Sequence, residues 1–148
     1  MNKRILLLAF AGLLLLNVAS LSAQENLQTT RIFEQYGKRK GATMVSLSDA
    51  VLDAYEMKTY KSLTLRDTDE ALPAIYRALE SDKKQAKIVK ENLADGELLS
   101  GYYQLPPDAS GANRFILFKR TKKGGATLIY IVGELDVTDL ISLLFTKE

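Results

Sequence analysis

The pattern of hydrophobic and polar positions divides the chain into a short apolar leader and a longer amphipathic part. Residues 5–18 form an almost unbroken apolar run, which follows a basic start and gives way to small residues that end at Ala23. This order is typical of a secretory signal peptide. We therefore expect residues 1–23 to be a cleavable signal peptide and residues 24–148 to form one mature domain in the periplasm or outside the cell.

A transmembrane anchor is the alternative interpretation of residues 5–18. The run is shorter than the roughly 20 apolar residues that a membrane-spanning helix needs, so the signal peptide is favoured. No membrane-spanning segment is then expected after cleavage. The chain contains no cysteine. Because a lipoprotein carries its lipid on a cysteine that follows the signal, this route to the membrane is excluded.

The first half of the mature domain alternates between helical and strand patterns. Ile32, Phe33 and Tyr36 share one side of a helix that we expect Thr29 or Thr30 to cap. Five further elements are predicted in this half: a strand over 42–47, a helix capped by Ser46 or Ser48, a strand over 60–66, a helix that opens at 67–70, and a second helix from Ser81 or Asp82 to Leu93. Each buries one apolar side, which indicates a shared core.

The final third of the chain favours strands. Three apolar segments, Leu98–Leu105, Arg114–Arg120 and Ala126–Gly133, are separated by short, turn-rich links. Such spacing predicts a three-strand antiparallel meander. A last short helix is expected from Asp136, with an apolar stripe of Val137, Leu140, Ile141 and Leu144. The predicted fold class is α+β: a single domain with a roughly five-stranded mixed or antiparallel sheet packed by helices.

Composition and charge exclude several classes of function. The leader holds two of the 20 basic residues, so the mature domain carries 18 basic and 18 acidic residues and no net charge. A balanced domain lacks the electrostatic field that attracts nucleic acid, which we do not expect as a partner. Histidine and cysteine are both absent. A Ser-His-Asp triad and a Cys-His pair are therefore impossible, and no metal or cofactor is expected.

Two stretches of the sequence have a familiar pattern. Ile32–Ser48 reads IFEQYGKRKGATMVSLS, and Leu128–Leu140 reads LIYIVGELDVTDL. Together with the leader they resemble small exported domains of unknown function common in Bacteroidetes, in which a Phe-x-x-Tyr helix leads into a strand and a late strand is followed by glycine and a short helix. The resemblance implies an envelope protein of α+β fold with no assigned chemistry and no known catalytic residues.

Tyrosines and a basic cluster are the candidate binding residues. Tyr102 and Tyr103 point to opposite faces of one predicted strand, so one ring is expected to be exposed to a sugar or a protein partner. Four cations surround the last hairpin: Lys119, Arg120, Lys122 and Lys123. A second basic stripe is expected on the helix that ends at Leu93: Lys83, Lys84, Lys87 and Lys90. The simpler interpretation is that the rings lie in the core and the cations on a solvated surface.

Carboxylates offer a weaker candidate site. Asp49, Asp53 and Glu56 are expected on one helix face, where they would hold Ca²⁺ or a sugar, or else form the solvated side of an amphipathic helix. Glycoside hydrolysis needs only two carboxylic acids, but the sequence singles out no pair.

These observations favour an exported, non-enzymatic module that binds a partner protein or another envelope component. The alternatives are a small carboxylate-dependent enzyme that acts on envelope glycan, and an accessory or sensor protein in envelope signalling. An unpaired sheet edge is expected at Leu98–Leu105 or at Ala42–Leu47.

Overall fold

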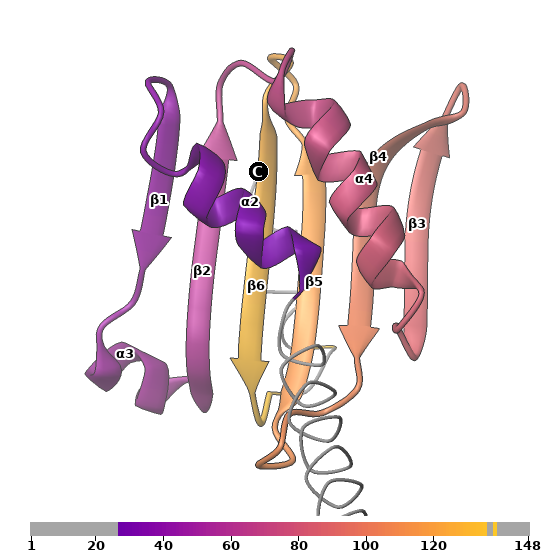
Figure 1. Ribbon diagram of the computed structural model, residues 1–148. Coiled ribbons are helices and arrows are strands. Elements are labelled where there is room, and N and C mark those ends of the chain that lie inside the picture. The colour runs from indigo at the N-terminus through magenta and orange to yellow at the C-terminus, as the bar shows by residue number, and fades with distance from the viewer. Residues whose placement is uncertain (1–26, 136–137, 139–148) are drawn as a thin grey trace, which may run out of the picture.

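The computed structural model describes residues 27–135 and residue 138 (Figure 1). The predicted signal peptide and most of the helix predicted from Asp136 lie outside these residues. Within the described part, no helix is long and apolar enough to cross a membrane.

A six-stranded antiparallel sheet forms the centre of the structure. The helices are α2 (Gln28–Tyr36), α3 (Asp49–Ala54) and α4 (Ala71–Lys83). The strands are β1 (Ala42–Ser46), β2 (Met57–Leu65), β3 (Ile88–Ala94), β4 (Glu97–Leu105), β5 (Asn113–Arg120) and β6 (Ala126–Gly133). The strand order is β1-β2-β6-β5-β4-β3, so α4 carries the chain from β2 to the opposite edge of the sheet.

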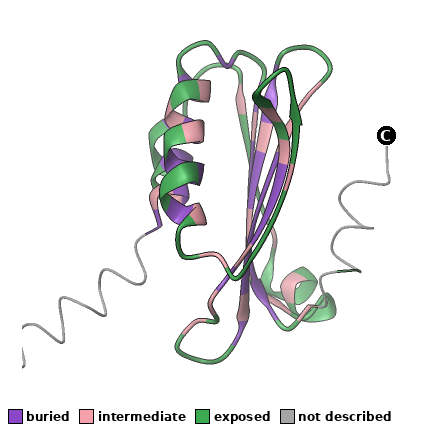
Figure 2. Ribbon diagram, turned by 90° about the vertical axis from the view of Figure 1, so that its right-hand side faces the viewer, coloured by how far each residue is buried: buried purple, intermediate pink, exposed green. Residues whose placement is uncertain are grey.

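Helices α2 and α4 pack side by side on one face of the sheet (Figures 1 and 2). The main core lies between these helices and the sheet, where Phe33, Ile75 and Phe118 are almost fully buried. Residues on the opposite face form a second cluster: Tyr102, Phe115, Leu117, Ile129 and Ile131. The strand alternation that sends neighbours to opposite faces therefore supplies two separate cores.

The α+β class and most predicted elements are confirmed. Ile32, Phe33 and Tyr36 are buried on one side of α2. The three C-terminal strands pair as the expected meander, and β5 and β6 lie in the middle of the sheet. The short helix after Ser48 is also present, but none of its residues is buried.

The helix predicted to end at Leu93 is wrong. Helix α4 continues through Ser81 to Lys83, and the following residues form the edge strand β3. The sheet therefore has six strands instead of five, and the four lysines of the supposed stripe do not share a helix. The cause is a tight hairpin at Asp95 and Gly96, whose φ angles of 51° and 77° are those that a primed turn requires.

The same hairpin changes which strands are sheet edges. Strand β3 pairs with β4 along its outer side, so the prediction of an unpaired edge at Leu98–Leu105 is wrong. The predicted edge at Ala42–Leu47 is confirmed, because β1 pairs only with β2 in the described part of the chain.

The start of α2 is held by a side chain from α4. Asp82 is 2% exposed. Its carboxylate accepts hydrogen bonds from the backbone N–H of Gln28 (2.9 Å), the backbone N–H of Thr29 (2.8 Å) and the Thr29 hydroxyl (2.8 Å). These N–H groups have no partner within the helix, and a negative charge is favourable at a helix N-terminus. Thr29 and Thr30 do not cap α2; the helix begins at Gln28, so both lie in its first turn.

We expect Asp82→Ala to lower the free energy of unfolding by about 3 kcal/mol, because it leaves three donors without an acceptor, two of them buried. Asp82→Asn keeps one acceptor and should lose less. Urea unfolding followed by circular dichroism measures both. The exposed Asp53→Ala is the matched control, and an equal loss in the control would contradict this role.

Candidate functional site

A groove runs between α2 and α4 on the side that faces away from the sheet. Its volume is about 380 Å³. Eight residues line it: Gln28, Arg31, Ile32 and Gln35 from α2, and Ala74, Arg77, Ala78 and Ser81 from α4. Residues three or four positions apart lie on the same side of a helix, so each set forms one row along the seam between the helices. Ile32 and Ala78 are buried at its floor.

Two arginines give this groove its charge. Among the described residues, neither Arg31 nor Arg77 makes a hydrogen bond or an ion pair, and both are exposed. None of the described residues that line the groove is acidic. A guanidinium presents planar N–H donors that match a carboxylate or a phosphate. The arrangement is therefore suited to bind an anion, with the Gln28, Gln35 and Ser81 side chains as neutral partners.

A second hollow lies where α2 ends and α4 begins, with a volume of about 330 Å³. Charges of both signs line it: Arg39, Lys40, Asp67, Asp69 and Glu70. The Arg39 guanidinium lies 4.4 Å from the centre of the Tyr36 ring and 3.3 Å from the Glu70 carboxylate. Because its arginine is already paired, this hollow is less suited to an anion than the groove.

The two candidate tyrosines are both buried, so the expectation of one exposed ring is wrong. Tyr103 is 1% exposed in the main core, and its hydroxyl donates to the Glu91 carboxylate at 2.8 Å. Its ring crosses Gly101, where any Cβ would collide with it. Tyr102 is 5% exposed on the opposite face, and its ring stacks on that of Phe115 with the two ring centres 6.1 Å apart. Both faces of β4 are covered, which the alternation of one strand does not reveal.

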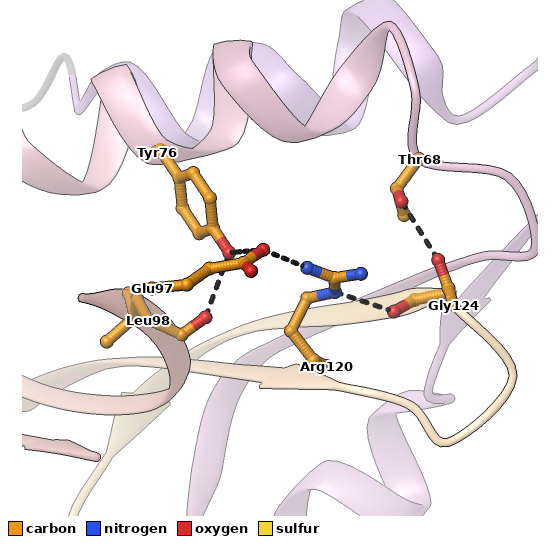
Figure 3. A network of polar contacts seen from close by, with 7 residues as sticks. Thr68, Tyr76, Glu97, Leu98, Arg120 and Gly124 are labelled. Atoms are coloured by element: carbon orange, nitrogen blue, oxygen red, sulfur yellow. Dashed lines mark hydrogen bonds and ion pairs between the residues drawn. The ribbon is translucent and has the colours of Figure 1, made fainter. Parts of the chain in front are cut away.

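The basic cluster at the last hairpin is divided between internal and solvent-facing positions. Figure 3 shows Arg120 within a polar network: its Nη1 donates to Glu97 at 2.6 Å, and its Nε donates to the Gly125 carbonyl at 3.3 Å. The Tyr76 hydroxyl, from α4, donates to the Leu98 carbonyl at 2.9 Å. Arg120 thus joins β5 to the start of β4 beneath α4.

The remaining cations of that cluster are less constrained. Lys122 and Lys123 are exposed in the turn, whereas Lys119 is half-buried and has a partner of its own. The turn itself is fixed from the other side by Thr68, whose hydroxyl donates to the Gly124 carbonyl at 2.9 Å (Figure 3). Lys122 and Lys123 are consequently the members of the predicted site that are available to a ligand.

The structure does not bring the predicted carboxylates together as one helical face. Asp49 and Asp53 lie on α3, but Glu56 follows the end of that helix with a φ of 56°. Across the described residues, no group of three or more acidic side chains is placed to hold a metal ion.

Glu91 is the centre of a polar cluster beneath the end of α4. It accepts hydrogen bonds from Lys83 Nζ at 2.6 Å and from the Tyr103 hydroxyl at 2.8 Å. Burial alone would raise the pKa of Glu91, but the hydrogen bonds from Lys83 and Tyr103 outweigh it and hold the pKa below its ordinary value of 4.5. Burial and the same carboxylate raise the pKa of Tyr103.

We expect Arg120→Gln to lower the free energy of unfolding by about 1 kcal/mol, since its ion pair is only partly shielded from solvent. The double variant Lys122→Gln with Lys123→Gln should stay within about 0.5 kcal/mol of the parent protein. Urea titrations compare the two. An Arg120 variant as stable as the lysine variant would show that the network is not structural.

Glu91 also predicts a dependence of stability on pH. A folded-state pKa below the unfolded value means that ionised Glu91 stabilises the fold above pH 4.5, and that this contribution is lost as the pH falls through the folded pKa. Glu91→Gln should therefore be less stable than the parent at neutral pH, with the difference shrinking in acid. Urea midpoints across this range test it, with the exposed Glu34→Gln as control. A difference that stays constant with pH would contradict the assignment.

Comparison with known proteins identifies a family but not an activity. No curated protein matches the chain. The model of one family of unknown function (DUF6108) matches residues 16–144, which covers the whole sheet and all three described helices. Because this match extends over most of the sequence, the chain belongs to that family of unknown function.

Proposed function

We propose that this protein is an exported, non-enzymatic binding module whose groove between α2 and α4 takes an acidic segment of a partner protein. The observation that carries the proposal is the pair of arginines, Arg31 and Arg77, that line one groove without any partner in the described part of the chain. Export is supported by the leader pattern of residues 1–23, and the absence of histidine and cysteine removes the commonest catalytic groups.

The lining of the groove favours a peptide over a sugar. The lining residues that the structure describes include no aromatic ring on which a sugar would stack. The α2 side runs from Gln28 to Gln35, which corresponds to about 10 Å at the helical rise and suits a few extended residues. Amide and hydroxyl groups at the Gln28, Gln35 and Ser81 positions offer donors and acceptors to a peptide backbone.

The alternative function is a glycan-active enzyme, whose active site would have to lie in the second hollow. Within the described part of the chain no carboxylate lines the groove, while Asp67, Asp69 and Glu70 line the second hollow. Glu70 is the ion-pair partner of Arg39, and its side chain is 87% exposed. Glycoside hydrolysis needs two carboxyl groups on either side of one bond, and nothing in the described part of the chain singles out such a pair in this hollow.

The test uses a fluorophore-labelled peptide of consecutive glutamates and fluorescence anisotropy. The double variant Arg31→Gln with Arg77→Gln should weaken binding by at least about tenfold, because each guanidinium contributes a charge-assisted hydrogen bond. Rising salt should weaken binding to the parent protein. Far-UV circular dichroism must show that the variant is folded.

Two matched variants decide whether the effect belongs to the groove. Arg66→Gln removes an exposed arginine outside it, and Lys122→Gln with Lys123→Gln removes the free cations of the last hairpin. Neither should change the affinity by more than about twofold. An equal loss of affinity in the Arg66 variant would mean that the peptide responds to net charge alone. An equal loss in the lysine variant would mean that it binds at the hairpin. Binding of an acidic polysaccharide without binding of the peptide would refute the protein partner.

A further inference from the structure

The second face of the sheet carries an apolar patch made of two rows of side chains. The strand registers place four residues in the first row: Ser62, Ile129, Leu117 and Tyr102. They place four more in the next row: Tyr60, Ile131, Phe115 and Gln104. The patch therefore crosses β2, β6, β5 and β4.

The centre of this patch is buried although no described helix packs on it. Phe115, Leu117 and Ile131 are each at most 1% exposed. Helices α2 and α4 lie on the other face (Figure 2), and the additional described apolar residues that pack against the patch are Met57 and Leu135, neither of which is in a helix. None of the described helices or strands therefore accounts for the burial of this face.

We propose that the cover is the C-terminal segment of this same chain, residues 136–145, packed on the patch as an amphipathic helix. The chain enters this face directly after β6, because Leu135 already contacts the patch. The segment that follows has four apolar positions at helical spacing: Val137, Leu140, Ile141 and Leu144. Asp136 precedes them as an N-cap.

The dimensions of patch and segment agree. Four strands at about 4.8 Å spacing span about 14 Å, and ten helical residues extend about 15 Å. At one end the patch is bounded by a row of half-buried polar residues: Thr64, Thr127, Lys119 and Ser100. Two rows match the width of one helix of about 10 Å.

The leader is a poorer occupant of the patch. Leu27 is the first described residue, and it is fully buried in the main core on the helix side of the sheet. Leu27 thus lies on the face opposite the patch, whereas Leu135 contacts the patch itself. This inference is independent of the groove and its ligand.

Methyl-selective nuclear Overhauser spectroscopy tests the proposal on protein expressed from its full sequence. Cross-peaks are expected between the methyl groups of Ile131 or Leu117 and those of Leu140, Ile141 or Leu144. A mixed sample of differently labelled chains separates contacts within one chain from contacts between two. Absence of these cross-peaks, or cross-peaks only between chains, would overturn the assignment, the latter in favour of a second copy.

Substitutions within the segment give a second readout by ANS fluorescence. Ile141→Asp puts a charge on the apolar stripe and should raise dye binding several-fold, because the patch becomes exposed. Ser142→Asp introduces the same charge one residue away, off the stripe, and should leave dye binding unchanged. Equal responses of the two variants would contradict a helix that packs through the stripe.

Discussion

The carboxylate of Asp82 is the constraint on which the helical layer depends. It lies near the end of α4 and accepts the first free N–H groups of α2, so the end of one helix is fixed to the start of the other. Two helices from distant parts of the sequence are thereby held side by side across the sheet. The groove exists because of this link: Gln28 and Ser81, which line its end, are each within one residue of the bonded pair Thr29 and Asp82.

A second constraint comes from the two central strands. Strands β5 and β6 are apolar on both faces, so both faces of each strand must be shielded from water. Phe118 and Leu128 face the helices, while Leu117 and Ile129 face the other way. A single helical layer satisfies only half of this requirement. The domain has no disulfide to compensate for an exposed core, so its stability depends on covering the second face as well.

The sequence predicted correctly those elements whose own hydrophobic pattern is sufficient to identify them. The stripe of Ile32, Phe33 and Tyr36 specifies a helix whatever lies beneath it, and the length and apolarity of the last strands place them at the centre. The prediction failed at residues 88–94, which form β3, because Ser81-Asp82 was interpreted as a break and the cap of a second helix. Asp95-Gly96 between two apolar segments is the signal that was available, since this dipeptide favours a hairpin turn.

The candidate site could not be predicted from single elements, because it depends on which faces of the helices and strands contact each other. Tyr103 is buried in the core beneath α4, and Tyr102 is buried in the cluster on the opposite face, and no local pattern in the sequence reports either burial. Arg31 and Arg77 belong to different helices, and each taken alone is an ordinary exposed cation. Their pairing follows only from the antiparallel packing that Asp82 fixes.

Net charge is accordingly a weak guide to the partners of this protein. The predicted mature domain has as many acidic as basic residues, which argued against nucleic acid as a partner. The structure shows that several cations, among them Arg39, Lys83 and Arg120, form ion pairs with carboxylates within the fold. Arg31 and Arg77 form no such ion pair within the described residues. A ligand responds to the charges within about a Debye length of its site, so a neutral domain can still present a locally cationic groove.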